Sequence, residues 1–159
     1  MKANTIEKEW SLDLDYSVSL GETYTGFMEG LKEKKFLGNK IGDQTFFPPK
    51  PFCNRTYELP SGWVESDGTG TVEAFTIYQK EPEGIVYPDA KVELSPPYIV
   101  AVIRISNSDQ CLIHLISGID ANDPEQLLNK VSAGLTVRPV WAEERHGNIL
   151  DIKYFEPVE

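Results

Sequence analysis

Few residues in this chain have side chains suited to catalysis, and they lie far apart in the sequence. Enzymes that use a nucleophile place a serine, cysteine or lysine beside a base, which a third group orients. His114 lies in an alternating apolar run, where we expect a hydrogen-bonded core histidine, and His146 lies in a polar turn. Cys111 has the surroundings of a small core residue. No phosphate-binding loop, dinucleotide glycine motif or metalloprotease motif occurs, so the sequence predicts a protein that is not an enzyme.

The composition limits the classes of protein to consider. With 159 residues, 40% of them hydrophobic and 25% charged, the chain suits one folded domain with a small appendage. No run approaches the roughly 20 apolar residues of a membrane span, and residues 1–5 are unlike a signal peptide. We therefore expect a cytoplasmic protein in which Cys53 and Cys111 are free thiols. The net charge of −10 argues against binding to nucleic acid or to a membrane surface.

The charge is distributed unevenly along the chain. Between Lys32 and Arg55 six basic residues accompany two acidic ones, a local balance of +4, whereas the remainder carries −14. A small positive region in an acidic protein is a candidate site for phosphate groups. The alternative is that these lysines form a solvated helix face.

A proline-rich segment divides the chain. Residues 46–53 contain three prolines, which fix φ and remove backbone donors, so neither a helix nor a central strand can run through them. Before this segment, residues 7–18 alternate polar and apolar side chains, as an extended arm would. A capping box at Ser19 and Glu22 then predicts a helix that ends near Lys35. Its apolar stripe packs either on the chain's own barrel or on another subunit, and consists of Tyr24, Phe27, Met28 and Leu31.

The region after the prolines contains apolar runs typical of strands. We expect a short helix at 125–130 and a long polar loop at 80–97 between these runs. Five strands with a helix between the third and fourth have the order of an OB-fold barrel. The predicted fold is mainly β: a five-stranded OB-fold barrel preceded by an N-terminal helix and a ribbon-like, proline-rich arm. The expected strands are 65–79, 98–105, 110–117, 135–143 and 149–155, and the expected segments of the chain are 1–37, 38–62 and 63–159.

Several of these stretches together resemble a known family. The motifs that carry the resemblance are Phe27-Met28-Glu29-Gly30-Leu31, Phe36-Leu37-Gly38-Asn39, residues 46–53, Gly68-Thr69-Gly70-Thr71-Val72 with Phe75-Thr76, and Tyr154-Phe155-Glu156-Pro157-Val158. Over roughly residues 16–158 the chain resembles the acyl-CoA-associated OB-fold family catalogued as domain of unknown function 35. The resemblance implies an N-terminal zinc ribbon like that of rubredoxin.

The zinc ribbon implied by the resemblance is degenerate in this sequence. The family's two Cys-x-x-Cys knuckles correspond here to Asn39 and Gly42 and to Cys53 and Thr56, so only Cys53 of the four cysteines remains. A structural zinc site needs four thiolate or imidazole ligands, and neither histidine lies nearby. We therefore expect an arm that binds no zinc and is held by its prolines, its phenylalanines and its partner.

The resemblance implies a non-catalytic accessory subunit. Members of the family accompany thiolases, hydroxymethylglutaryl-CoA synthases, aldolases or acyl-CoA hydratases and help to hold the acyl-CoA. The expected partners are thus a thiolase-superfamily or other acyl-CoA enzyme and its coenzyme A thioester, with the CoA phosphates on the positive region and the rings of Phe46 and Phe47 on the adenine or pantetheine. The residues expected to contact CoA or the partner are Lys35, Lys40, Phe46, Phe47, Pro48, Pro49, Lys50 and Arg55, and those of the partner-docking helix are Tyr24, Phe27, Met28 and Leu31.

Two alternatives remain open at this point. One is an OB-fold that binds single-stranded nucleic acid through aromatic side chains in a basic groove, which the acidic barrel disfavours. The other is an enzyme that uses Cys53, because Arg55 could lower the pKa of that thiol. No base or orienting group for Cys53 is visible in the sequence.

Overall fold

The computed structural model describes residues 14, 17–79 and 96–158. The extended arm expected at residues 7–18 and the loop expected at 80–97 lie almost entirely outside these ranges. Within them, no helix is both long enough and apolar enough to cross a membrane.

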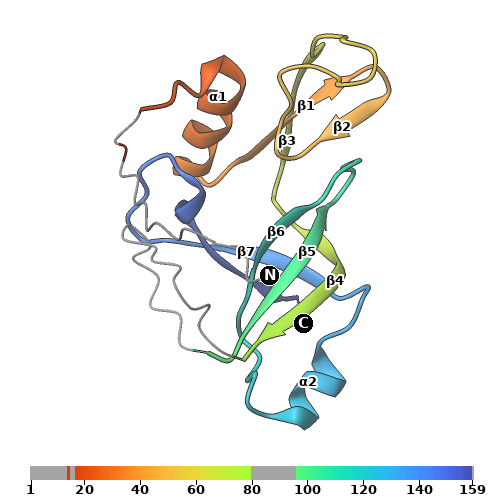
Figure 1. Cartoon of the computed structure of the whole chain (residues 1–159), viewed down its shortest axis with the longest axis vertical. Helices are drawn as coiled ribbons and strands as arrows, with labels where there is room; N and C mark the ends of the chain where they lie inside the picture. Colours follow the sequence, from red (N-terminus) through yellow and green to blue (C-terminus); the bar gives the residue numbers. More distant parts are fainter. Residues whose placement is uncertain (1–13, 15–16, 80–95, 159) are drawn as a thin grey trace, which may run out of the picture.

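The chain forms two sheets, one above the other in Figure 1. The upper part, residues 17–66, consists of a helix and a three-stranded antiparallel sheet in the order β2-β1-β3, and we call it the arm. The lower part is a closed barrel in the order β4-β5-β6-β8-β7. The elements are α1 (Gly21–Lys32), β1 (Phe36–Ile41), β2 (Gln44–Phe46), β3 (Gly62–Ser66), β4 (Gly70–Tyr78), β5 (Tyr98–Ile105), β6 (Leu112–Ile116), α2 (Pro124–Lys130), β7 (Thr136–Trp141), η1 (Ile149–Asp151) and β8 (Ile152–Pro157).

This architecture confirms the predicted mainly β fold with an OB-type barrel, in which α2 lies between the third and fourth barrel strands. One difference concerns the strand expected at 65–79, which is divided in two. β3 pairs with β1 in the arm, and β4 begins the barrel. The chain changes direction between them at Gly68, whose φ is +81°. The arm therefore continues to Ser66, beyond the boundary expected at residue 62.

The apolar stripe of α1 packs on its own chain, one of the two interpretations that the sequence left open. Phe27 and Leu31 are 1% and 0% exposed, and Met28 lies half-buried against the same core. Tyr24, the remaining member of the stripe, is 38% exposed. The expectation that Phe27 and Leu31 dock on a partner is therefore wrong for the chain as it is folded here, because neither side chain reaches the surface.

The ends of α1 also differ from the prediction. The capping box expected at Ser19 is wrong, since the N-cap is Leu20 and makes no side-chain hydrogen bond. The helix ends at Lys32 rather than near Lys35. Lys34 adopts a left-handed φ of +63°, which ends the helix and directs the chain into β1.

Phe36, at the start of β1, lies where the arm meets the barrel. Its ring is fully buried and its centroid lies 6.2 Å from that of Phe27 in α1, 5.7 Å from Trp141 in β7 and 6.3 Å from Phe155 in β8. Aromatic pairs at such separations add to the free energy gained by burial alone. The arm and the barrel thus share one hydrophobic core.

Hydrogen bonds from the turn between β5 and β6 also hold the arm. The Asp109 amide donates to the Thr45 carbonyl and the Thr45 amide donates to Asp109 Oδ2, both at 2.7 Å. The Phe47 amide donates to Ser108 Oγ at 3.3 Å, and Gln110 Nε2 donates to the Pro48 carbonyl. These bonds satisfy backbone groups in β2 and the proline segment that no neighbouring strand could reach.

A second connection joins the last turn of α1 to the barrel. Arg145 Nε donates to the Lys32 carbonyl at 2.8 Å, and its Nη1 donates to the carbonyls of Ala142 and Glu143. A guanidinium at the C-terminal end of a helix satisfies an otherwise unpaired carbonyl and complements the helix dipole. The loop that carries Arg145 is fixed in turn by the buried Asp151 carboxylate, which accepts hydrogen bonds from three successive backbone amides at 146–148.

His114 lies in β6 and its ring points into the barrel, where its centroid is 5.5 Å from that of Phe155. The expectation of a hydrogen-bonded core histidine is only half right, because the buried Nδ1 atom has no hydrogen-bond partner among the described residues. Burial lowers the pKa of His114 below its usual value, since desolvation disfavours the charged imidazolium.

We expect Gly68→Ala to destabilise the fold strongly. An added Cβ would lie 2.5 Å from the Phe36 ring, and the positive φ is unfavourable for alanine. The overlap with Phe36 and the unfavourable φ together predict a loss of about 2–5 kcal/mol in the free energy of unfolding, which urea denaturation measures. Gly62→Ala is the matched control, since no atom lies within 4 Å of its Cβ position. Equal effects of the two substitutions would contradict this account of the junction.

We expect the free energy of unfolding to fall as the pH decreases from 7 to 5. The unfolded chain protonates its histidine near the usual pKa of about 6.5, whereas folded His114, with its lowered pKa, takes up the proton only at a lower pH. The stabilisation is thus complete above that pH and is lost as the pH falls towards the folded pKa. His114→Leu should flatten this slope, and His146→Gln, which alters an exposed histidine, is the control. A slope unchanged in the leucine variant would refute the prediction.

Candidate functional site

The proline segment is held on the arm's sheet by one buried amide. Asn39 in β1 is 2% exposed, and its Nδ2 donates to the Lys50 carbonyl at 2.6 Å. Its Oδ1 accepts from the Lys50 amide at 3.1 Å. A pair of hydrogen bonds between one side chain and the backbone N–H and C=O of one residue fixes both position and orientation. Asn39 therefore sets where Lys50 and the residues after it lie.

The structure places the predicted aromatic contacts of this site in the interior. Phe46 and Phe47 are 4% and 1% exposed, and Pro49 is buried as well. The expectation that the two rings pack on adenine or pantetheine is therefore wrong, because both are already covered by the chain's own core. Pro48 is half-buried and carries the carbonyl bonded by Gln110.

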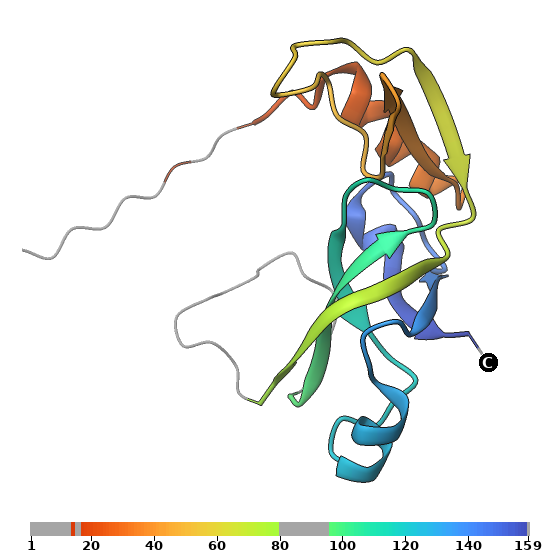
Figure 2. The same ribbon diagram turned by 90° about the vertical axis from the view of Figure 1, so that its right-hand side faces the viewer.

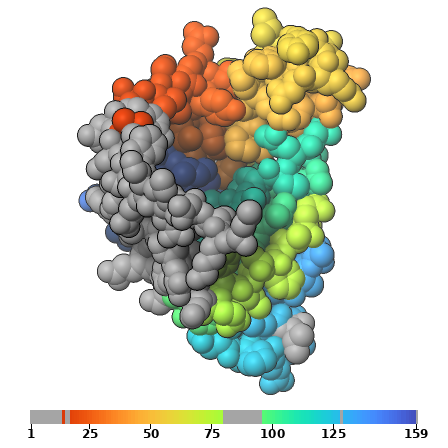
Figure 3. All heavy atoms as spheres, in the orientation of Figure 1, coloured from red at the N-terminus to blue at the C-terminus, as the bar shows by residue number. Residues whose placement is uncertain are grey.

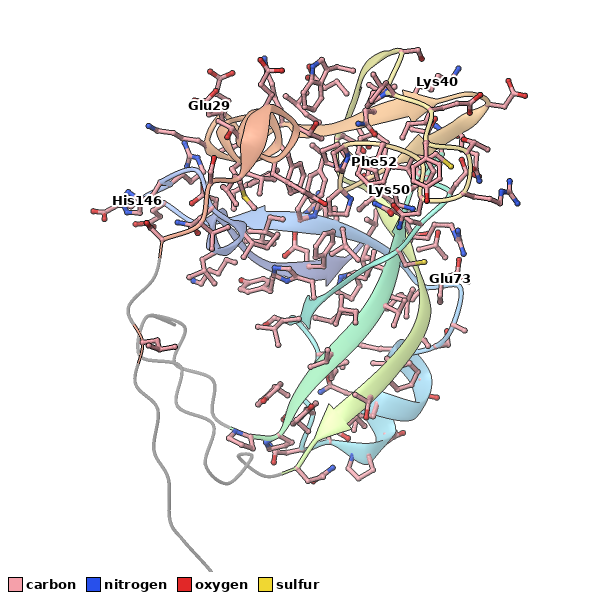
Figure 4. The ribbon with its side chains drawn as sticks, turned by 45° about the horizontal axis from the view of Figure 1, so that its top comes forward. Glu29, Lys40, Lys50, Phe52, Glu73 and His146 are labelled. Carbon is pink, nitrogen blue, oxygen red and sulfur yellow. The ribbon has the colours of Figure 1, made fainter. Side chains whose placement is uncertain are left out.

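The predicted cations lie at the surface of the arm. Lys35, Lys40 and Arg55 are exposed, and Lys35 is 3.5 Å from the carboxylate of Glu33. Lys50 is half-buried, with its Nζ 4.1 Å from the centroid of the Phe46 ring. A cation above an aromatic face gains electrostatic stabilisation, so the Phe46 ring holds the Lys50 ammonium group at this position. Figure 4 shows Lys40 and Lys50 projecting from the arm, on the side away from His146.

An exposed aromatic pair lies beside Lys50. The rings of Phe52 and Tyr57 are stacked, with centroids 6.2 Å apart and planes 16° apart, and they are 40% and 76% exposed. Figure 4 shows Phe52 near Lys50. Tyr57 is not among the residues predicted from the sequence, because no sequence pattern marks the turn that brings it to Phe52. Flat apolar surface next to cationic groups can hold an aromatic ring that carries phosphate.

The turn between these aromatic residues contains Cys53. The Cys53 amide donates to the Glu58 carbonyl at 2.9 Å, and the Tyr57 amide donates to the Cys53 carbonyl at 2.8 Å. The Thr56 side chain, and then the Thr56 and Arg55 amides, lower the pKa of the Cys53 thiol by hydrogen bonding. Cys53 and Cys111 are both free thiols.

The arm offers a poor set of metal ligands. In the described ranges, no three histidine, cysteine, aspartate or glutamate side chains gather closely enough to hold a metal ion. At the four positions where the resemblance places zinc ligands, Asn39 is engaged with Lys50, Gly42 lies in an exposed turn, and Thr56 faces Cys53. These residues do not fit a zinc ion, which requires thiolate or imidazole ligands.

A separate cavity is lined by residues of α2, β7 and β8, and α2 lies at the end of the barrel away from the arm in Figure 1. Its volume is about 630 Å³. Arg138 in its wall is engaged with Glu156, which is also in the wall, at 2.8 Å. None of the predicted site residues lines it. The lining residues are Gly118, Asn129, Lys130, Leu135, Arg138, Glu156, Pro157 and Val158.

Comparison with known proteins defines the class of protein. Residues 63–142, half of the chain, match the family described as the C-terminal OB-fold domain of ChsH2. The chain therefore belongs to this family, and the expected relation to the OB-fold family catalogued as domain of unknown function 35 is confirmed. No curated protein matches the sequence.

Two solved structures have a similar fold. A chain of the Ltp2-ChsH2(DUF35) aldolase has 19% sequence identity and a TM-score of 0.59, and the alignment covers 89% of this chain and 98% of that one. A DUF35-family protein of unknown function from Sulfolobus solfataricus has 20% identity and a TM-score of 0.56, with 86% and 84% coverage. At these identities the two structures support the fold, and the arm is included in the similarity.

We expect Asn39→Ala to loosen the proline segment. The substitution removes both hydrogen bonds to Lys50 and leaves its buried peptide groups unpaired, which predicts a loss of about 1–3 kcal/mol in the free energy of unfolding. Urea denaturation measures the loss, and amide hydrogen exchange at Lys50 should become faster. Asn54→Ala, in the exposed turn of the same arm, is the control and should have little effect. Unchanged exchange at Lys50 would show that the Asn39 amide does not hold the segment.

Proposed function

We propose that this protein is a non-catalytic accessory subunit of an acyl-CoA-processing enzyme of the thiolase superfamily. The observation that carries the proposal is its membership of the ChsH2 OB-fold family, together with a cationic and aromatic surface on the arm. The name of the similar Ltp2-ChsH2(DUF35) aldolase joins ChsH2 with an aldolase. Hydratases and other aldolases of acyl-CoA are further candidate partners by the resemblance of the sequence.

The absence of a catalytic arrangement in the described residues supports the non-catalytic role. His114 lies inside the barrel, whereas His146 is exposed in the loop that precedes η1. Hydrogen bonds from Thr56 and Arg55 lower the pKa of the Cys53 thiol. The carboxylate of this turn, Glu58, accepts from the Thr56 hydroxyl at 3.0 Å, and neither described histidine lies in the turn to act as a base for the thiol. An acyl group held by this chain would therefore react through residues of the partner.

The arm is the part of the chain that we propose to help hold the coenzyme A thioester. Lys40, Lys50 and Arg55 supply positive charge for the phosphates. Phe52 and Tyr57, rather than the buried Phe46 and Phe47, supply the aromatic surface for the adenine. Exposed charges of this kind contribute little each, so the site requires the partner enzyme to complete it.

The outer face of the barrel argues against the nucleic-acid alternative. OB-folds hold single strands across their second and third strands, which are β5 and β6 here, with aromatic and basic side chains. The outward residues at the centre of this face are Val100 and Val102 in β5 and Ile113 and Leu115 in β6. At the ends of this face, Arg104 is paired with Glu73 at 2.7 Å, and the Tyr98 ring is stacked on Tyr78 with centroids 5.1 Å apart. The aliphatic centre between them provides neither the stacking platforms nor the positive charge that such binding needs.

The first test is affinity purification of the tagged protein from its native cell, followed by mass spectrometry. We expect a stoichiometric thiolase-superfamily enzyme, hydratase or aldolase. Recovery of the chain without any acyl-CoA enzyme would refute the accessory role.

The second test concerns the arm. In the purified complex, the triple variant Lys40→Gln, Lys50→Gln and Arg55→Gln should retain the partner and bind coenzyme A roughly 10-fold more weakly, at about 0.5 kcal/mol for each exposed charge. Isothermal titration calorimetry measures the affinity. A matched triple variant on the barrel, Lys130→Gln, Arg138→Gln and Lys153→Gln, is the control. Equal affinities of the two variants would exclude the arm as the CoA contact.

A further inference from the structure

The far half of β4 has an unpaired edge. β4 pairs with β5 along its whole length, but it pairs with β7 only at Gly70 and Thr71. Two backbone bonds between Val72 and the chain before β7 extend that contact, and beyond them no described backbone group bonds to the outer edge of Ala74–Tyr78. Figure 2 shows this half of β4 at the front of the barrel, running past the end of β7.

Among the described residues, this edge has none of the features that usually prevent strands from pairing between molecules. Native edges are protected by lysine, by proline, by a bulge within the strand or by a covering segment. The sequence Ala74-Phe75-Thr76-Ile77-Tyr78 contains no charge, proline or glycine, and its side chains favour β structure. The one bulge of β4 lies before it, at Glu73. Phe75 and Tyr78 are 39% and 40% exposed, so apolar surface accompanies the free backbone groups.

We propose that the edge Ala74–Tyr78 pairs antiparallel with the same edge of a second copy of this chain, forming a two-fold dimer with a sheet continuous across both barrels. Two copies of a chain with net charge −10 repel each other at most surfaces. Contact through an uncharged edge is opposed least by this repulsion, so this edge is where two copies can associate. Pairing would satisfy the backbone groups of both strands and cover part of Phe75 and Tyr78 in each.

The positions of the charges are compatible with this symmetry. A two-fold axis perpendicular to the sheet leaves the inner faces of both barrels on one side of the joined sheet. In the two possible registers, either Thr76 lies opposite Thr76 of the second copy or Phe75 lies opposite Phe75. Glu73 then lies opposite Gln79 or Ile77 of the other copy, and never opposite another acid. Glu73 is also neutralised within its own chain by Arg104, at 2.7 Å. Like charges placed directly opposite each other would have opposed the pairing.

The test is the mass of the full chain in solution. Sedimentation velocity should show a species of twice the 17.9 kDa of the monomer, whose fraction rises with concentration in the micromolar range. Amide hydrogen exchange within Ala74–Tyr78 should be slower in the dimer and become faster on dilution. A chain that stays monomeric at several hundred micromolar would overturn the proposal.

Charge variants locate the contact. Ala74→Lys with Thr76→Lys places lysines opposite each other in either register and should leave a monomer, whose unaltered circular dichroism confirms that it is folded. Mixing this variant with Ala74→Glu and Thr76→Glu should restore a dimer made of one copy of each. Ile113→Lys, on the outer face of the same sheet but away from the edge, is the control and should still dimerise. Loss of the dimer in the control but not in the edge variant would overturn the proposal.

Neither result depends on the proposed function. The dimer is measured on the isolated chain, whereas the accessory role is measured by recovery of a partner enzyme. A failed dimer test with a recovered partner refutes the edge pairing alone, and a lone dimer refutes the accessory role alone.

Discussion

The burial of Phe36 is the constraint on which the rest of the structure depends. Its ring contacts aromatic side chains from α1, β7 and β8, so helix, arm and barrel are joined at one point. The chain passes the ring at Gly68, where a side chain would collide with it. The arm is therefore not an independent lobe attached by a connector. Its charged surface is presented at a fixed orientation to the barrel, with Arg145 and the β5–β6 turn restraining the two remaining sides.

The barrel could be predicted because its signals are local. Residues 98–105 and 112–116 are apolar runs on either side of a polar turn, which is sufficient to indicate a hairpin. The arm's sheet could not be predicted in the same way. β3 pairs with β1, more than twenty residues earlier in the chain, and only Asp67, Gly68 and Thr69 separate it from β4. A gap this short is no signal that the chain leaves one sheet and enters another, which it does at Gly68.

The candidate site was predictable in its charges and not in its aromatic residues. Lysines and arginines are almost always exposed, so their position in the sequence was informative. The prolines around Phe46, Phe47 and Phe52 remove the periodicity that distinguishes buried from exposed rings. Phe46 and Phe47, which lie next to β1, are buried. Phe52 follows Lys50, the residue that Asn39 binds, and it is exposed. Tyr57 joins Phe52 through a turn with a φ of +59°, which no pattern in the sequence marks.

Asn39 holds the proline segment with an amide and not with a metal ligand. An amide needs no metal ion to be delivered during synthesis, cannot be oxidised to a disulfide and cannot be stripped by a chelator. The contact between β1 and Lys50 is made by groups of the chain alone. At this position the arm's geometry is therefore indifferent to the cell's zinc supply and to oxidative conditions, which act directly on lobes held by thiolates.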